Sequence, residues 1–354
     1  MQKNILLVVC VVLLFGVSCR KADTTFSVPD FPKKGTIASN KINDTLLMTY
    51  PFEMFVTDNN IYVLAYVGGT FIQVYDKSDG HYVGSGAVMG RGPGELLAGV
   101  NMYYDPKSST VSVYDNQSRK IVKYLIDEKG SDLFVFQEER SFLGLINPIR
   151  KAWPLQDSTY LVDGQVGVED GDMGRFQMVI GDRLTGSWNS FPLDDMEQCW
   201  TFWTTATTIS PDHMRFADGT LFGAILETFD VKDNRVTQRG CRMFYPPAIE
   251  YQSGVTSPTE QTVFGFTSLC STNEYIYGVF LGSKDMNDFD NISVFDWDGR
   301  EVATFDTDCN VLRICCSDSE PGRIYAIAVS PENSFYLVSF DFDIYPASEL
   351  EYPG

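Results

Sequence analysis

The stretch Ile72-Gln-Val-Tyr-Asp76-Lys-Ser-Asp-Gly80-His-Tyr-Val83 is the clearest structural signal in this chain of 354 residues. An apolar strand ends in an aromatic residue and Asp76, a polar turn with Gly80 follows, and a second strand begins directly after the turn. β-Branched and aromatic residues favour strands, whereas Asp and Gly reverse the chain through side-chain-to-backbone hydrogen bonds and positive φ. The stretch therefore predicts a β-hairpin.

The same unit recurs along the chain, with aspartates at positions 76, 115, 182, 230, 296 and 341. Successive aspartates are separated by 39, 67, 48, 66 and 45 residues. A second repeated strand, apolar on both faces, precedes most hairpins, which indicates strands covered on both sides. Periods of about 40 to 50 residues with four strands each are typical of β-propeller blades. The two long intervals contain insertions near 138–159 and 245–265, for which a seventh, degenerate blade is the alternative.

The two ends of the chain indicate how such a ring closes. A strand-like stretch at 36–49 precedes the first hairpin, and only 13 residues follow Asp341. In propellers an N-terminal strand can complete the last blade, which removes an open sheet edge. The sequence therefore predicts an all-β fold over residues 36–354: a six-bladed β-propeller of four-stranded antiparallel blades, with an N-terminal strand closing the last blade. No helix is expected, because no segment sustains a 3.6-residue apolar period between caps.

The first 18 residues have the features of an export signal: Lys3, an apolar run from Ile5 to Val17, and Ser18 before Cys19. The run is shorter than the roughly 20 apolar residues that span a membrane. Gly16-Val-Ser-Cys19 resembles a bacterial lipobox, although Gly16 stands where Leu is usual. The resemblance implies that Cys19 is lipidated and becomes the mature N-terminus, with residues 19–35 as a tether. A plain secreted protein is the alternative. We expect a cell-envelope location, periplasm-facing or at the cell surface.

The charge and the cysteines restrict the partners. With 47 acidic residues against 27 Lys and Arg, the formal net charge is −20, and such a field repels nucleic-acid phosphates and anionic lipid. We therefore expect a monomer that meets the membrane only through its lipid and binds no nucleic acid. The eight cysteines show no CxxC pair and no zinc-like spacing. Buried free thiols are the favoured interpretation, although export permits disulfides.

The segment Met89-Gly-Arg-Gly-Pro-Gly-Glu95 stands between the first two hairpins. It lacks the Lys-Ser/Thr and the helix of a phosphate-binding loop. We interpret it as a tight connection between blades, in which glycines take positive φ, proline fixes φ, and Arg91 can pair with Glu95. The structural motif comprises Gly90, Arg91, Gly92, Pro93, Gly94 and Glu95.

The same segment resembles the G-x-G-x-GPGE motif of TolB-like six-bladed propeller lipoproteins, and the blade pattern resembles this group over most of residues 40–345. The resemblance implies a six-bladed propeller on an envelope-anchored protein. It brings no catalytic residue with it.

Two places offer candidate ligand-binding residues. Cys199-Trp-Thr-Phe-Trp203 is the densest aromatic cluster, and Trp200 and Trp203 could stack on sugar rings or hold a partner if exposed. Burial against a neighbouring blade is the alternative. Asp212 and His213 fall on a loop that is expected at one mouth of the propeller channel, where His213 could face a ligand or could simply be solvated.

No motif assigns an activity. Calcium loops of the D-x-[DN]-x-[DN]-G type, G-x-S-x-G elbows and H-E-x-x-H are absent. We therefore assign no catalytic residue, metal ligand or cofactor. The leading hypothesis is a non-enzymatic binding or interaction module for an unidentified protein or carbohydrate ligand. The alternative is a calcium-dependent hydrolase or lyase whose metal sits at the propeller axis.

Overall fold

A computed structural model describes residues 25–143, 149–156, 158–164, 175–181, 183–188, 190–193, 201–203, 205–317 and 319–344. All regular elements in these ranges are β-strands. Within them, no helix has the length and apolar character that crossing a membrane requires.

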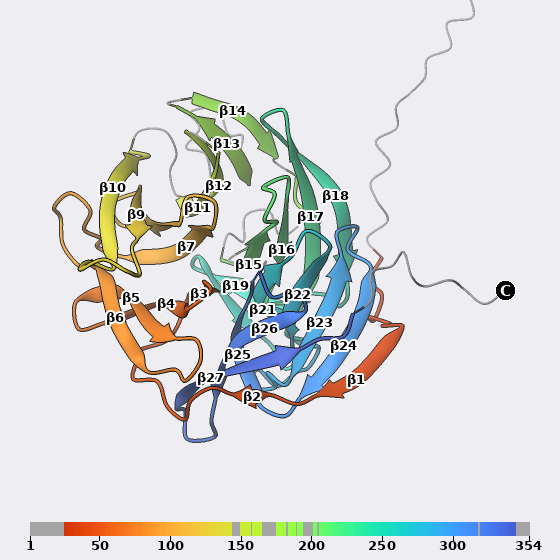
Figure 1. Cartoon of the computed structure of the whole chain (residues 1–354). Helices are drawn as coiled ribbons and strands as arrows, with labels where there is room; N and C mark the ends of the chain where they lie inside the picture. Colours follow the sequence, from red (N-terminus) through yellow and green to blue (C-terminus); the bar gives the residue numbers. More distant parts are fainter. Residues whose placement is uncertain are drawn as a thin grey trace, which may run out of the picture.

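Six antiparallel sheets stand around a central axis, and each begins with its innermost strand (Figure 1). Blade 1 contains β3 (Glu53–Val56), β4 (Asn60–Val67), β5 (Thr70–Asp76) and β6 (Tyr82–Val88). Blade 2 contains β7 (Gly99–Asp105), β8 (Thr110–Asp115), β9 (Lys120–Ile126) and β10 (Phe134–Ser141). Blade 3 contains β11 (Ile149–Gln156), β12 (Thr159–Gly164), β13 (Phe176–Ile180) and β14 (Arg183–Trp188). Blade 4 contains β15 (Ala206–Ile209), β16 (Arg215–Gly219), β17 (Ile225–Lys232) and β18 (Arg235–Met243). Blade 5 contains β21 (Phe266–Ser271), β22 (Tyr275–Phe280), β23 (Asn291–Asp296) and β24 (Glu301–Thr307). Blade 6 contains β25 (Asn310–Cys316), β26 (Arg323–Val329) and β27 (Phe335–Asp341).

The N-terminal segment closes the ring as predicted. β2 (Asn40–Lys41) pairs with β27 and supplies the fourth strand of blade 6. Upstream, β1 (Lys33–Ile37) adds a fifth strand to blade 5 by parallel pairing with β24, and Phe31 is buried between blades 4 and 5. The packed domain thus begins a few residues before position 36.

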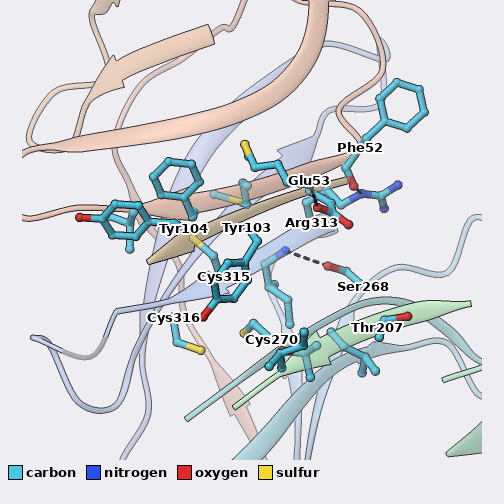
Figure 2. Close-up of a pocket in the computed structure, with 18 of the residues that line it drawn as sticks. Phe52, Glu53, Tyr103, Tyr104, Thr207, Ser268, Cys270, Arg313, Cys315 and Cys316 are labelled. Atoms are coloured by element: carbon cyan, nitrogen blue, oxygen red, sulfur yellow. Dashed lines mark hydrogen bonds between the residues drawn. The ribbon is translucent and has the colours of Figure 1, made fainter. Parts of the chain in front are cut away.

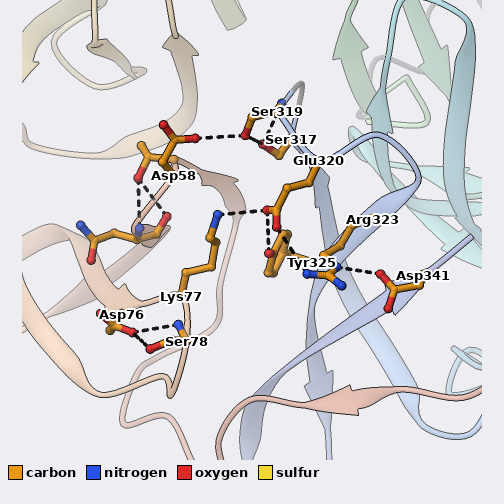
Figure 3. A network of polar contacts seen from close by, with 12 residues as sticks. Asp58, Asp76, Lys77, Ser78, Ser317, Ser319, Glu320, Arg323, Tyr325 and Asp341 are labelled. Atoms are coloured by element: carbon orange, nitrogen blue, oxygen red, sulfur yellow. Dashed lines mark hydrogen bonds and ion pairs between the residues drawn. The ribbon is translucent and has the colours of Figure 1, made fainter.

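A polar network also joins the first and last blades (Figure 3). Lys77 of blade 1 pairs with Glu320 of blade 6, Nζ to Oε2 at 3.0 Å. The hydroxyl of Tyr325 donates to the same carboxylate at 2.8 Å. Ser319 donates to Asp58 at 3.0 Å. Side chains as well as backbone pairing therefore hold the seam where the chain's two ends meet.

The insertion predicted at 245–265 contains a separate hairpin, β19 (Ile249–Gln252) and β20 (Val255–Pro258). Across the described ranges the structure has six blades, and the alternative of a seventh is not supported.

One copy of the repeated hairpin occupies a different place in its blade. Asp76, Asp296 and Asp341 end the third strand of their sheets, whereas Asp115 ends the second strand of blade 2. The third strand there is β9, which is followed directly by Asp127. Two consecutive turns of this blade thus carry an aspartate. If Asp127 rather than Asp115 is taken as the repeat position, the spacings of 39 and 67 residues become 51 and 55 residues.

Among the described residues the hydrophobic core forms seven clusters, of which six lie one between each pair of neighbouring blades and the seventh contains Phe202, Trp203 and Ile225. Because every sheet is packed on both faces, its middle strands are apolar on both faces. β4, for example, is buried from Asn60 to Ala65. This packing explains the continuous apolar runs that precede the hairpins in the sequence.

Candidate ligand-binding channel

The innermost strands face the axis with a backbone edge that has no strand partner, so these amide and carbonyl groups need other partners. Side chains from adjacent blades supply some of them at all six blade junctions. The contacts are Glu53 Oε2 with Met102 N (2.5 Å), Asn101 with both backbone groups of Ala152 (3.0 and 3.2 Å), Lys151 Nζ with Thr205 O (2.9 Å), Ser271 Oγ with Ile209 O (3.2 Å), Ser268 Oγ with Ile314 N (3.2 Å) and Arg313 Nε with Phe52 O (2.7 Å).

These strands enclose a cavity of about 1190 Å³ on the axis. Figure 2 shows Glu53, Arg313 and Ser268 on its wall, contributed by different blades. Tyr50 and Phe52 line the same cavity and are 51% and 45% exposed. The Arg313 guanidinium lies over the Tyr50 ring, 5.1 Å from its centroid. The cavity therefore offers charged groups and open aromatic faces together.

Glu53 is the acidic group of the cavity on which both Lys151 and Arg313 act electrostatically. Burial raises the pKa of Glu53 to about 6, although Lys151, the amide of Met102 and Arg313 all lower it. The carboxylate is ionised at neutral pH and becomes protonated in mild acid. Its one hydrogen bond from Met102 leaves further acceptor positions open.

Charge is unevenly distributed in the cavity. Lys151 and Arg313 line it on the inner strands, and Arg150 beside them pairs with Asp163, Nε to Oδ2 at 3.0 Å. These cations stand out in a chain of net charge −20.

The loop after β3 and the loop after β9 contribute three acids and Lys129 to the same cavity. Asp58, Asp127 and Glu128 lie there, and Glu128 accepts hydrogen bonds from Thr57 at 2.6 Å and Asn59 at 2.7 Å. The channel therefore differs in charge along its length.

Three thiols also line the cavity, those of Cys270, Cys315 and Cys316. Together with Cys241 and Cys309, they are free in the described part of the chain. Burial raises the pKa of Cys270 and of Cys315 well above the usual range. Cys199 lies outside the described residues.

The predicted aromatic platform is not exposed. Trp203 is 1% exposed and packs against Phe202, and its ring lies 4.4 Å from the guanidinium carbon of the buried Arg175. Trp203 is therefore buried, which is the alternative that the sequence left open, and it covers a buried cation. Trp200 lies outside the described residues, as does Cys19.

Asp212 and His213 contact different partners. His213 lies in the β15–β16 turn, and its ring nitrogens contact the Tyr103 hydroxyl and the Leu155 carbonyl. Asp212 instead accepts hydrogen bonds from Ser210 (2.6 Å) and the amide of Met214 (3.0 Å). Burial raises the pKa of Asp212, but these bonds and the nearby Arg215 leave it lowered. His213 thus joins three blades, and the prediction that it faces a ligand is not supported.

The glycine-rich segment connects β6 to β7, the outer strand of blade 1 to the inner strand of blade 2. Glu95 accepts a hydrogen bond from the Gly92 amide at 2.6 Å, and Gly94 has a φ of +74°. Arg91 is exposed, and the described residues show no ion pair between it and Glu95. Of the three glycines of the segment, Gly94 takes positive φ as predicted and Gly90 and Gly92 do not, and the partner of Glu95 is backbone rather than Arg91.

The alternative function, a calcium-dependent hydrolase or lyase, requires a metal site at the propeller axis. Among the described residues, the one cluster with ligand atoms close enough for a metal is Asp76, Asp79 and His81, in an outer hairpin turn. In the channel, Asp163 is paired with Arg150, and Glu53 faces Lys151 and Arg313. These neighbouring cations oppose cation binding at the axis.

Sequence reasoning missed the channel residues. Lys151, with Arg150 before it, and Arg313 are charges inside strand segments that are otherwise apolar, Ile149-Arg-Lys-Ala-Trp and Val311-Leu-Arg-Ile-Cys. A charge at such a position signals a side chain that does not face a blade interface. The sequence alone does not show which strands are innermost, so this signal does not identify the channel.

Comparison with known proteins agrees with this architecture. The TolB-like 6-blade propeller-like family model matches residues 30–319. None of the curated proteins is significantly similar in sequence.

Three solved structures share the fold at low sequence identity. A protein from Bacteroides fragilis NCTC 9343 described as exported has a TM-score of 0.53 and 13% identity, covering 87% of this chain and 98% of its own. A DUF4221 member from Bacteroides vulgatus ATCC 8482 has a TM-score of 0.50 and 10% identity, with coverages of 87% and 94%. The PQQ-bound aldose sugar dehydrogenase of Streptomyces coelicolor also has a TM-score of 0.50 and 10% identity, with coverages of 88% and 99%. The chain therefore belongs to the TolB-like six-bladed propeller family.

Proposed function

We propose that this chain is an exported, lipid-anchored binding protein that holds a small organic anion with a sugar or aromatic ring in its central channel, without catalysing a reaction. The observation that carries this proposal is the cavity of about 1190 Å³ on the axis, into which Glu53, Lys151 and Arg313 come from three different blades. Its volume is somewhat larger than that of most small-molecule pockets, which are about 300 to 1,000 Å³.

The cations favour an anionic group on the ligand. Lys151 donates one hydrogen bond to Thr205, and an ammonium group has three protons to donate. A ligand carboxylate can therefore bind Lys151 without displacing that contact. Arg313 is fixed by the carbonyls of Phe52 and Thr267 and adds positive potential without moving.

The rings favour a flat or cyclic body on the ligand. Tyr50 and Phe52 keep about half of their surface open beside Arg313. Aromatic faces of this kind stack on sugar and aromatic rings. The ligand would then place its ring against Tyr50 and its anionic group toward Lys151.

The N-terminal sequence supports the location. The export signal and the lipobox-like Gly16-Val-Ser-Cys19 favour lipidation of Cys19, and membership of the TolB-like family is consistent with an envelope protein. Labelling with radioactive palmitate should mark the wild-type chain in a bacterial host, and Cys19→Ala should not be labelled. Persistent labelling of Cys19→Ala would contradict the anchor.

Isothermal titration calorimetry at pH 7 tests the ligand class with three probes: glucuronate, benzoate and glucose. We expect glucuronate or benzoate to bind, and glucose, which has no anionic group, to bind more weakly. The tighter of the two anions shows whether the channel prefers a sugar ring or an aromatic ring. Lys151→Met should weaken binding about tenfold or more, the equivalent of one lost charged contact. Lys123→Met is the matched control, because Lys123 lies on β9 outside the cavity lining and pairs with Glu138.

Equal affinity of wild type and Lys151→Met would contradict channel binding. Binding of none of the three probes would contradict the ligand class.

A further inference from the structure

Two thiols face each other across the junction of blades 5 and 6. Cys270 belongs to β21 and Cys316 to β25, the inner strands of these neighbouring blades. Cys270 and Cys316 pack in the same cluster, and the Cys316 thiol adds to the effect of burial in raising the pKa of Cys270. Cys316 Sγ also donates to the carbonyl of Ser271, the residue after Cys270, at 3.2 Å. Both cysteines lie on the channel wall in Figure 2.

The third thiol of this wall is directed elsewhere. Successive side chains of a strand point to opposite sides, and Cys315 packs with Tyr75 and Leu46 in the cluster between blades 6 and 1. Cys270 and Cys316 belong instead to the cluster between blades 5 and 6. The fold therefore selects Cys316, not Cys315, as the partner of Cys270.

Access to the pair is one-sided. Cys316 is partly exposed and lines the cavity, whereas Cys270 is 7% exposed. A small disulfide that enters the channel meets Cys316 first. Burial raises the pKa of Cys270, so this thiol is a poor nucleophile toward an oxidant in solution, whereas a mixed disulfide on Cys316 would present its sulfur directly beside it.

We propose that Cys270 and Cys316 are a redox-active dithiol that closes to a disulfide between blades 5 and 6 by exchange with a disulfide oxidant. The sulfur of Cys316, after losing its proton, attacks one sulfur of the oxidant, which forms a mixed disulfide and releases one thiol. Cys270 then loses its proton and attacks the sulfur of Cys316, which releases the second thiol. The protein is oxidised by two electrons, the oxidant disulfide is reduced, and the two protons end on the two released thiols.

The bond would alter the wall of the cavity without involving the charged residues there. It joins β21 to β25 covalently, and blade 6 is the blade that the N-terminal segment completes. An oxidising compartment outside the cytoplasm would favour the closed form. The inference does not depend on which ligand, if any, the channel binds.

Peptide mapping of the folded full chain tests the proposal. The protein is incubated with oxidised glutathione, alkylated with iodoacetamide, digested with trypsin and analysed by mass spectrometry. Tryptic peptide 243–284 contains Cys270 as its single cysteine, whereas 314–323 contains both Cys315 and Cys316. We expect these two peptides to be cross-linked, with loss of two hydrogen atoms, and to separate after dithiothreitol. Cys309, in peptide 301–313, should be alkylated.

Two variants locate the bond. Cys315→Ser should keep the cross-link, because Cys316 is the proposed partner. Cys270→Ser should leave glutathione on Cys316, since nothing resolves the mixed disulfide. Alkylation of all thiols in the wild type, a stable mixed disulfide at Cys316 in the wild type, or loss of the cross-link in folded Cys315→Ser would each overturn the proposal.

Discussion

The interface between blades 3 and 4 and the interface between blades 5 and 6 occupy equivalent places in the ring but are built differently. The second is a cluster of apolar side chains from both sheets. The first contains Arg175, fully buried, in ion pairs with Asp218 (Nη2 to Oδ2, 2.8 Å) and Glu227. Burying apolar surface is favourable, whereas burying charge is costly unless every charge is paired. The fold thus accommodates either a charged or an apolar interface between neighbouring sheets.

The charged interface also reaches the channel. Asp163, which pairs with Arg150 in the cavity wall, acts electrostatically on both Arg175 and Asp218. Trp203 and Phe176 cover the guanidinium, at 4.4 and 4.9 Å from its carbon to the ring centroids. A line of alternating charges therefore connects the candidate site to the interior of this interface, and the apolar interface between blades 5 and 6 has no counterpart among its clustered residues.

The largest effect should follow removal of the central cation. Arg175→Ala leaves Asp218 and Glu227 buried together without their counterion, which we expect to cost about 3 to 5 kcal/mol of unfolding free energy. Urea denaturation at pH 7 measures it. A loss under 1 kcal/mol would show that the ion pairs are not needed for this interface.

A truncation in the apolar interface gives the matched comparison. Ile324 is 1% exposed in the cluster between blades 5 and 6, so Ile324→Ala should cost about 2 to 4 kcal/mol through lost burial and a new cavity. Unlike Arg175→Ala, its cost should change little between pH 5 and pH 7. A strongly pH-dependent cost, measured by the same urea denaturation, would remove the distinction between the interfaces.

The pH dependence of stability should have opposite signs at two carboxylates. Burial raises the pKa of Glu227 to about 6, although Arg175 lowers it. The folded state then binds more protons than the unfolded state between about pH 4.5 and 6, so this group's contribution to stability falls as pH rises through that window. The stability of wild type minus that of Glu227→Gln should therefore decrease from pH 4.5 to 6.5. An increase would mean that the paired, ionised form dominates.

Glu320, at the seam between blades 6 and 1, should show the opposite pH dependence of stability and the smallest change in the free energy of unfolding. Burial raises its pKa, but hydrogen bonds from Lys77 and Tyr325 and the charge of Arg323 leave it lowered. Its stabilisation is present above about pH 4.5 and is lost as pH falls. Glu320→Gln should cost about 1 kcal/mol at pH 7 and nothing in strong acid. A cost that persists below pH 3 in thermal denaturation would assign the effect to packing instead.

The sequence predicted the blades better than the site, for a physical reason. Hairpins such as that at Asp76 are encoded locally by turn chemistry and alternation, so blade number and ring closure followed from spacing. The placement of Trp203 depends on Arg175, 28 positions earlier in the chain. The role of Lys151 depends on which strand lies innermost, and that is set by assembly of the whole ring. Local pattern contains neither relation.

A crystal structure of the complex with whichever of glucuronate or benzoate binds tighter tests the central claim most directly. The account predicts density inside the channel, with the ligand carboxylate within hydrogen-bonding distance of Lys151 Nζ and the ring against Tyr50. The account would be contradicted if, in a crystal whose channel is open to solvent, the ligand density lay at the outer surface and the channel held water alone.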